Sequence, residues 1–242
     1  MTHILTAHGR EHFFASAGPR ASSASNIPAL REMCHSLANI NRYTGHTRVA
    51  YSVAEHSLLV TRIAREMLSA TPMLQLLCLL HDGHECITGD VASPVKQELG
   101  EAWYRFETRE QCRFLAHYEL VDAYYNCHAA VKRCDLIALA TERRDLLPYE
   151  PVHHLPWPVI DTPGQEIPPA PGIHIDLKEG YLLSRFEWAV WQAYQLQTAI
   201  VQTARAAGHT LGGRVKLNVE KPPTALPDLP AQPTHTDDHN GW

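Results

Sequence analysis

The sequence predicts an all-α fold, because apolar side chains recur at helical spacing along most of the chain and no series of strands appears. The clearest helical pattern runs from Tyr51 to Met67, where apolar residues follow one another in steps of three and four. A second segment, Leu74 to Leu80, is almost wholly apolar and ends in the charged pair His81-Asp82. Since buried charge is costly unless it is paired or bound to a metal, this helix end indicates a polar site within the core.

The first half of the chain shows clear helix signals. Residues 1–27 are rich in Ala, Ser and Gly and predict a loop or extended N-terminal segment. A first helix is expected over residues 28–39, with Pro28 in its first turn. Ser52 is the predicted N-cap of the next helix, where Glu55 completes a capping box. Thr71-Pro72 begins the apolar helix that ends at His81-Asp82.

The second half predicts longer helices and one long loop. Residues 100–117 and 121–147 each show helical spacing, and Asp135 falls on the apolar stripe of the longer helix. Residues 148–172 contain eight prolines, so we expect a loop over 148–175 without regular structure. A last helix is expected over about 177–207, followed by a disordered tail over 208–242. The expected organisation is thus an N-terminal extension, one domain over 28–207, and the tail.

Composition excludes several classes of protein. The net charge of −5 argues against a broad nucleic-acid-binding surface, so no nucleic-acid partner is expected. No apolar run approaches the roughly 20 residues of a membrane helix, and the N-terminus does not resemble a signal peptide. The six cysteines form no C-x-x-C pair, which favours a reducing environment and no zinc ribbon. We therefore expect a cytoplasmic protein without a membrane partner.

Four ionisable residues are predicted to point inward from three helices. His56 shares the apolar stripe of its helix, His81-Asp82 ends a buried helix, and Asp135 lies on a third buried face. Each has an ordinary alternative, because a core histidine is usually hydrogen-bonded and an inward aspartate usually caps a helix or forms an ion pair. Together, however, they can neutralise one another only through a shared positive charge. The set therefore predicts a divalent metal site, for which Co²⁺, Mn²⁺, Mg²⁺ and Zn²⁺ are all suitable.

The order of these residues resembles the H…HD…D pattern of the HD-domain metal-dependent phosphohydrolases. The similarity covers roughly residues 28–147 and is greatest to the 5′-deoxynucleotidase subgroup and its phage relatives, including the phage dATP triphosphohydrolases. The segments that carry it are Arg42–His46, Ser52–Ser57, His81–Glu85, Thr88–Asp90 and Ser93–Lys96. The resemblance implies an HD-domain helical bundle, which this chain would extend by the Pro-rich loop, a C-terminal helix and the tail.

The resemblance also implies roles for individual residues. It assigns the metal to His56, His81, Asp82 and Asp135. Glu85 would position or deprotonate the attacking water, and Asp90 would hold the sugar or pass a proton. The expected substrate contacts are Arg42, Lys96 and Lys132 on the phosphates and Tyr43 near the sugar, where related nucleotidases often have tryptophan.

Each of these assignments has an alternative. Glu85 could be a solvated glutamate at a helix end, and Asp90 could serve only the turn beside Gly89. The three basic residues could be solvated surface side chains, which is the usual case for lysine and arginine. His84 and His128 are further possible ligands, but the four-residue set is complete without them.

The function expected from these observations is hydrolysis of deoxynucleotides by metal-activated water. A dNTP triphosphohydrolase acting on dATP is the first expectation, since three basic residues suit a triphosphate. The alternatives are a 5′-deoxynucleotidase that releases phosphate from dNMPs and a non-catalytic, nucleotide-binding regulatory HD protein. An HD-type cyclic-dinucleotide phosphodiesterase is disfavoured because no Gly-Tyr-Pro follows the HD pair. We further expect a homo-oligomer.

Overall fold

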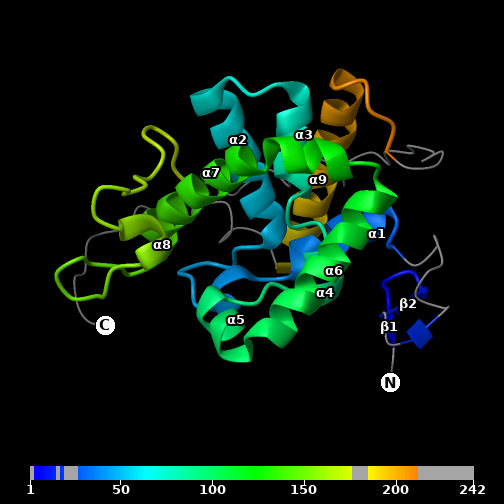
Figure 1. Ribbon diagram of the computed structural model, residues 1–242, viewed down its shortest axis with the longest axis horizontal. Helices are drawn as coiled ribbons and strands as arrows, with labels where there is room; N and C mark the ends of the chain where they lie inside the picture. Colours follow the sequence, from blue (N-terminus) through cyan, green and yellow to red (C-terminus); the bar gives the residue numbers. More distant parts are fainter. Residues whose placement is uncertain (1–2, 15–16, 19–26, 176–184, 212–242) are drawn as a thin grey trace, which may run out of the picture.

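The computed structural model describes residues 3–14, 17–18, 27–175 and 185–211, and these residues are mostly helical (Figure 1). The helical fold class is thereby confirmed. The exception is a short antiparallel hairpin of β1 (His3–Leu5) and β2 (Glu11–Phe13) in the N-terminal segment. None of the described helices is both long enough and apolar enough to cross a membrane.

The longer helices follow the order that the sequence predicts. The bounds of the helices are α1 Leu30–Asn39, the 3₁₀ turn η3 Arg42–Gly45, α2 Val53–Leu68, α3 Pro72–Leu80, α4 Glu85–Thr88, α5 Ser93–Leu99, α6 Glu101–His117, α7 Val121–Leu146, α8 Pro158–Asp161 and α9 Arg185–Ala206. The first residues expected in the last helix, 177–184, lie outside the described part of the chain, as does most of the expected tail, 212–242.

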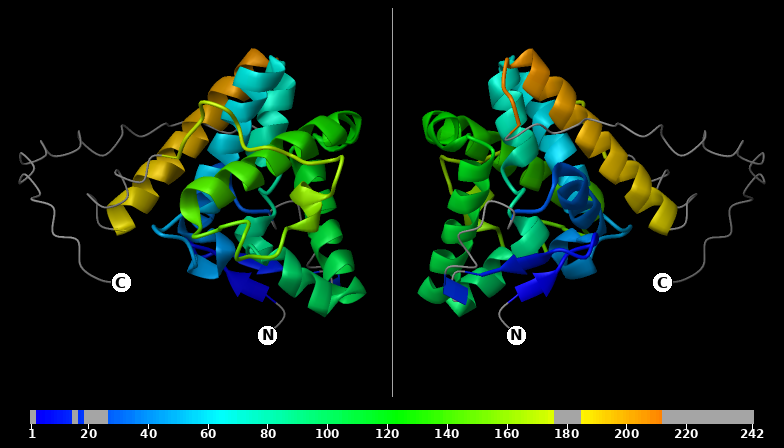
Figure 2. Two further views of the ribbon diagram at one scale, coloured as in Figure 1. Left: turned by 90° about the vertical axis from the view of Figure 1, so that its left-hand side faces the viewer. Right: turned by 90° about the vertical axis from the view of Figure 1, so that its right-hand side faces the viewer.

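The core forms where α1, α2, α3, α7 and α9 meet. Helix α9 packs against α1, α2 and α3, while α7 crosses α2 and α3 (Figures 1 and 2). Side chains such as Leu37, Val60, Leu77 and Leu196 are completely buried between these helices. Burial of each such side chain contributes about 1.5–3 kcal/mol to stability. Apolar packing therefore fixes the relative positions of α2, α3 and α7, the three helices expected to carry the metal ligands.

The N-terminus of α2 is fixed by the capping box that the sequence predicts. The Glu55 N–H donates to Ser52 Oγ at 3.2 Å, and the Ser52 N–H donates to Glu55 Oε2 at 2.7 Å. Ser52 Oγ also donates to Gln192 Oε1 of α9 at 2.6 Å. The same serine thus begins α2 and joins it to α9.

The Pro-rich segment contains a helical turn that we did not expect. Our prediction of no regular structure over 148–175 is wrong at α8, where Pro158 occupies the first turn and so removes no needed hydrogen bond. The Trp157 N–H donates to Asp161 Oδ2 at 2.6 Å, and Arg143 of α7 binds both Asp161 oxygens at 2.5 and 2.8 Å. These contacts hold the segment against α7.

Helix α9 ends close to the expected position, but the chain that follows it differs from expectation. We placed the disordered tail from residue 208, but His209 Nε2 donates to the Tyr118 carbonyl at 2.8 Å and Leu211 is buried. The packed structure therefore continues to residue 211.

The N-terminal hairpin is joined to α1 through one buried carboxylate, Glu32, which is 2% exposed. Its oxygens accept hydrogen bonds from the Thr6 hydroxyl at 2.6 Å and from Arg10 Nη2 at 2.5 Å. It also accepts the Ala29 N–H at 3.2 Å at the start of α1. Burial opposes ionisation, but these hydrogen bonds outweigh it and lower the pKa of Glu32 to about 2.

Gly83 has no room for a side chain, which gives a first stability prediction. A Cβ at this position would collide with the ring of Phe114, a buried residue of α6. We expect Gly83→Ala to destabilise the metal-free protein by about 1–3 kcal/mol, which thermal unfolding would measure. Shortening the opposing ring should relieve the collision, so Gly83→Ala/Phe114→Leu should lose less stability than the two single variants together. Additive losses would mean that the collision is not the cause.

Glu32 gives a second prediction, on pH dependence. The ionised carboxylate stabilises the fold in full above its ordinary pKa of 4.5, and this contribution is lost as the pH falls toward about 2. Glu32→Gln should therefore cost about 1–3 kcal/mol at pH 7, with the difference from wild type shrinking at acidic pH in urea unfolding. Glu11→Gln, which changes a half-exposed residue of β2, should have little effect. A pH-independent difference between Glu32→Gln and wild type would contradict this explanation.

Candidate metal centre

Three helices bring together the side chains predicted to bind metal. His56 extends from α2, His81 and Asp82 follow α3, and Asp135 extends from α7. His56 Nε2 lies 3.3 Å from His81 Nε2, 3.5 Å from Asp82 Oδ2 and 3.3 Å from Asp135 Oδ1. His81 Nε2 lies 3.1 Å from Asp82 Oδ2. Within the described residues, His56, His81 and Asp82 form a group that could hold a metal ion, and Asp135 adjoins it through His56.

The other ring nitrogens of the two histidines determine what faces this centre. His56 Nδ1 lies 2.5 Å from Glu142 Oε1, and His81 Nδ1 lies 2.8 Å from the Cys78 carbonyl oxygen. Carboxylate and carbonyl oxygens only accept hydrogen bonds, so each Nδ1 carries a proton. In the neutral rings both Nε2 atoms then present lone pairs beside the oxygens of Asp82 and Asp135. Four converging acceptors fit a cation, and this ring orientation is usual for metal-binding histidine.

The same acceptors favour a proton on His56 when no other cation is present. Burial of the ring and the charge of Arg42 oppose protonation, but Glu142 and Asp135 outweigh them and raise the pKa of His56 to about 9. Burial also disfavours ionised Asp82, yet the neighbouring His81, His56 and Arg42 hold the pKa of its carboxyl well below the usual range. The centre thus attracts positive charge.

Glu142 is the residue of this site that our sequence interpretation missed. It is completely buried and accepts hydrogen bonds from His56, Tyr51, Tyr43 and Arg42. Its position was visible in the sequence, because it lies two helical turns after Asp135 on the same stripe of α7. Its partners were not visible, since they belong to segments almost a hundred residues earlier.

Glu85 begins α4 and lies among other acidic groups. Its side chain is buried, and Oε2 has no hydrogen-bond partner in the described part of the chain. Burial, followed by the charges of Asp82 and Asp90, raises the pKa of Glu85 well above its ordinary value. Burial likewise raises the pKa of Asp90, and the charge of Asp82 adds to the effect. Both predicted catalytic acids therefore share the electrostatic environment of the metal ligands.

The three predicted phosphate contacts differ in their surroundings. Arg42 lies at the centre, with Nη2 3.2 Å from Glu142 Oε2 and Nη1 3.9 Å from Asp82 Oδ2. Lys96 Nζ lies 2.5 Å from Glu107 Oε1 of α6, and Lys132 Nζ lies 2.8 Å from Asp135 Oδ2. Each basic side chain thus already has a carboxylate partner.

Tyr43 lies beside an aromatic residue that we did not predict. Its ring centroid is 6.4 Å from that of Trp157 in the Pro-rich segment, and its hydroxyl donates to Glu142 Oε2 at 2.6 Å. Tyr43 and Thr44 both have left-handed backbone conformations, with φ of 56° and 52°. Such conformations are costly for residues other than glycine and are common at functional sites.

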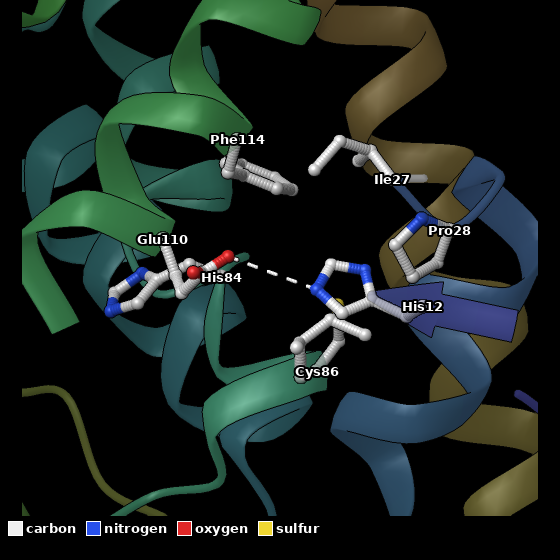
Figure 3. Close-up of a pocket in the computed structure, with 8 residues that line it drawn as sticks. His12, Ile27, Pro28, His84, Cys86, Glu110 and Phe114 are labelled. Atoms are coloured by element: carbon white, nitrogen blue, oxygen red, sulfur yellow. Dashed lines mark ion pairs between the residues drawn. The ribbon is translucent and has the colours of Figure 1, made fainter. Parts of the chain in front are cut away.

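The two further histidines considered as ligands lie outside the metal-binding group. His84 lines a small cavity with the ion pair of His12 and Glu110, whose atoms are 3.7 Å apart (Figure 3). His128 is exposed on α7 beside Tyr124. The cavity contains none of the predicted metal ligands or substrate contacts.

Comparison with known proteins places the chain beside two relatives of undescribed activity. No family model matches the chain. An uncharacterized protein of Rhodobacter capsulatus is 39% identical over 83 residues, which are 33% of this chain and 42% of that protein. The uncharacterized protein YfdR of Escherichia coli K12 is 32% identical over 148 residues, or 59% of this chain. Because that match spans 76% of YfdR, the chain belongs to the same family as YfdR.

Proposed function

We propose that the protein is an HD-domain phosphohydrolase that uses a divalent metal to hydrolyse deoxynucleotides, with dATP as the first candidate substrate. The observation that carries the proposal is the convergence of His56 Nε2, His81 Nε2, Asp82 Oδ2 and Asp135 Oδ1, together with the buried carboxyl group of Glu85, which interacts electrostatically with Asp82. A purely structural metal site would not need a further buried acid with an oxygen that is unpaired among the described residues.

The ligand set suits a divalent ion held by His56, His81, Asp82 and Asp135. When bound, such an ion supplies Lewis-acid chemistry, which makes water more acidic and polarises a phosphoryl group. Glu85 would accept a proton as water oxygen bonds to phosphorus and the bond to the leaving oxygen breaks, once the positive charge of a bound ion lets its carboxyl group ionise. Asp90, which has a raised pKa, would hold the sugar or pass a proton to the leaving group.

Arg42 is the basic residue best suited to the substrate phosphates. Its guanidinium lies beside Asp82 and can donate hydrogen bonds to phosphoryl oxygens, which stabilises developing charge. Lys96 and Lys132 would contribute only by sharing or exchanging their partners Glu107 and Asp135. Three cationic groups favour a triphosphate, whereas Arg42 alone would suffice for a monophosphate. The second candidate is therefore a 5′-deoxynucleotidase acting on dNMPs.

A non-catalytic nucleotide-binding protein is the remaining candidate. It would need the metal ligands and Arg42 but would have no use for a buried general base. Glu85 has a buried oxygen without a hydrogen-bond partner among the described residues, which favours catalysis over this candidate.

Loss of one metal ligand should abolish tight metal binding. Loss of a residue that only hydrogen-bonds to a metal ligand already weakens metal binding about 10–100-fold. We therefore expect Asp135→Asn, which changes a predicted ligand, to weaken Co²⁺ binding by more than about 100-fold. Asp122→Asn is a matched control, since Asp122 is an exposed aspartate on the same helix. Titration followed by Co²⁺ absorption would measure the affinities, and circular dichroism would check folding. Equal affinities in the folded Asp135→Asn variant and the wild type would refute the site.

The reaction can be identified from its products. We expect dATP, incubated with the protein and Co²⁺, Mn²⁺ or Mg²⁺, to yield deoxyadenosine and inorganic triphosphate. Glu85→Gln should lower kcat by about 10²–10⁴-fold with Co²⁺ affinity unchanged, because it removes the base and leaves the ligands intact. Glu98→Gln, at an exposed position of α5, should match wild type.

The alternatives give different products. Turnover of dAMP but not dATP would replace the triphosphohydrolase with the nucleotidase. Nucleotide binding to the metal-loaded protein without any released phosphate species would instead identify the non-catalytic protein.

A further inference from the structure

We propose that Glu142 is a positioning residue that couples metal binding at His56 to the conformation of the Arg42–Gly45 turn. The Glu142 carboxylate bonds both to His56 and to side chains of the turn, so a change at one should alter the other. That a nucleotide binds at this turn rests on the proposed function. The coupling between the turn and the metal centre does not rest on it.

The two oxygens of Glu142 serve different parts of the site. Oε1 accepts from His56 Nδ1 at 2.5 Å and from the Tyr51 hydroxyl at 3.0 Å. Oε2 accepts from the Tyr43 hydroxyl at 2.6 Å and from Arg42 Nη2 at 3.2 Å. A carboxylate offers about four acceptor positions, so these four donors fill it. The side chain is completely buried, so bulk solvent does not reach it.

On the metal side, Glu142 decides which nitrogen of His56 faces the centre. Its acceptor oxygen holds the proton on Nδ1, so Nε2 remains available as a ligand. The Tyr51 hydroxyl shares that oxygen and limits its movement. Without the carboxylate, no charged partner would hold the proton on Nδ1 of His56, whereas Asp82 and Asp135 would still lie beside Nε2.

On the side of the turn, Glu142 holds a strained backbone in place. Tyr43 and Thr44 occupy the left-handed region, a conformation that persists only where surrounding contacts enforce it. The Tyr43 and Arg42 side chains both bond to Oε2, and the Arg42 N–H bonds to the Tyr51 carbonyl at 2.9 Å. The turn that presents Arg42 is therefore held by the same group that orients His56.

Variants of single hydrogen bonds can separate coupling from simple packing. We expect Glu142→Gln to weaken Co²⁺ binding about 10–100-fold, the usual effect of losing the hydrogen-bond partner of a ligand. Tyr43→Phe removes a hydroxyl that donates to Glu142 and not to a predicted metal ligand, yet it should weaken Co²⁺ binding severalfold. If both changes act through Glu142, the double variant should bind Co²⁺ no more weakly than Glu142→Gln alone.

The experiment is a Co²⁺ titration of wild type, Glu142→Gln, Tyr43→Phe, Tyr51→Phe and the Glu142→Gln/Tyr43→Phe pair. Tyr125→Phe is the control, since Tyr125 is 71% exposed on the same helix as Glu142. Nitrogen NMR of the Zn²⁺-loaded protein adds a readout that stability alone would not move. It should show the Nδ1-protonated form of His56 in wild type and its loss in Glu142→Gln.

The outcomes discriminate between the proposals. Unchanged Co²⁺ affinity in Tyr43→Phe, or effects that multiply in the double variant, would overturn the coupling. If Glu142→Gln does not fold, the comparison of Tyr43→Phe with Tyr125→Phe still decides. Non-additive Co²⁺ affinities in a protein that hydrolyses neither dATP nor dAMP would uphold the coupling and refute the proposed function. Hydrolysis of dATP or dAMP together with additive effects on Co²⁺ affinity would uphold the proposed function and refute the coupling.

Discussion

The structure depends on a cluster of hydrogen-bond acceptors that is held together by apolar packing. Around His56 Nε2, the nearest atoms of His81, Asp82 and Asp135 lie at 3.3–3.5 Å, and none of them is a donor when the rings are neutral. Such atoms repel one another unless a proton or a cation lies among them. The buried leucines of α2 and α3 supply the free energy that keeps these groups together. Apolar packing therefore holds the acceptors close together, and a proton or cation among them removes their mutual repulsion.

Charge balance around this cluster favours a bound cation. Three carboxylates, those of Asp82, Asp135 and Glu142, lie among two cationic side chains, with Arg42 beside Asp82 and Glu142 and Lys132 beside Asp135. One negative charge is left over, and a cation at the centre would offset it. Burial, and after it the negative charge of Asp82, raises the pKa of Glu85 in the same region.

Local and periodic signals predicted much of this arrangement. The capping box of Ser52 and Glu55 marked the start of α2, and helical spacing indicated that His56 and Asp135 point inward. Such signals do not predict contacts between segments that are distant in the sequence. Neither a capping rule nor a helical period relates Glu142 to His56, 86 residues earlier, or Trp157 to Tyr43. Both contacts depend on how α7 and the Pro-rich segment pack, which the sequence pattern does not specify.

The contact between Tyr43 and Glu142 changes how this aromatic residue contributes to the site. A phenol hydroxyl has one proton, and Tyr43 donates it to Glu142 Oε2. The hydroxyl can then only accept a hydrogen bond from a ligand, while the ring of Tyr43 remains available for stacking. The ring of Trp157 lies beside it at an interplanar angle of 32°. The positions of these two rings therefore depend on two segments, one fixed through Glu142 to the metal centre and the other fixed through Asp161 to α7.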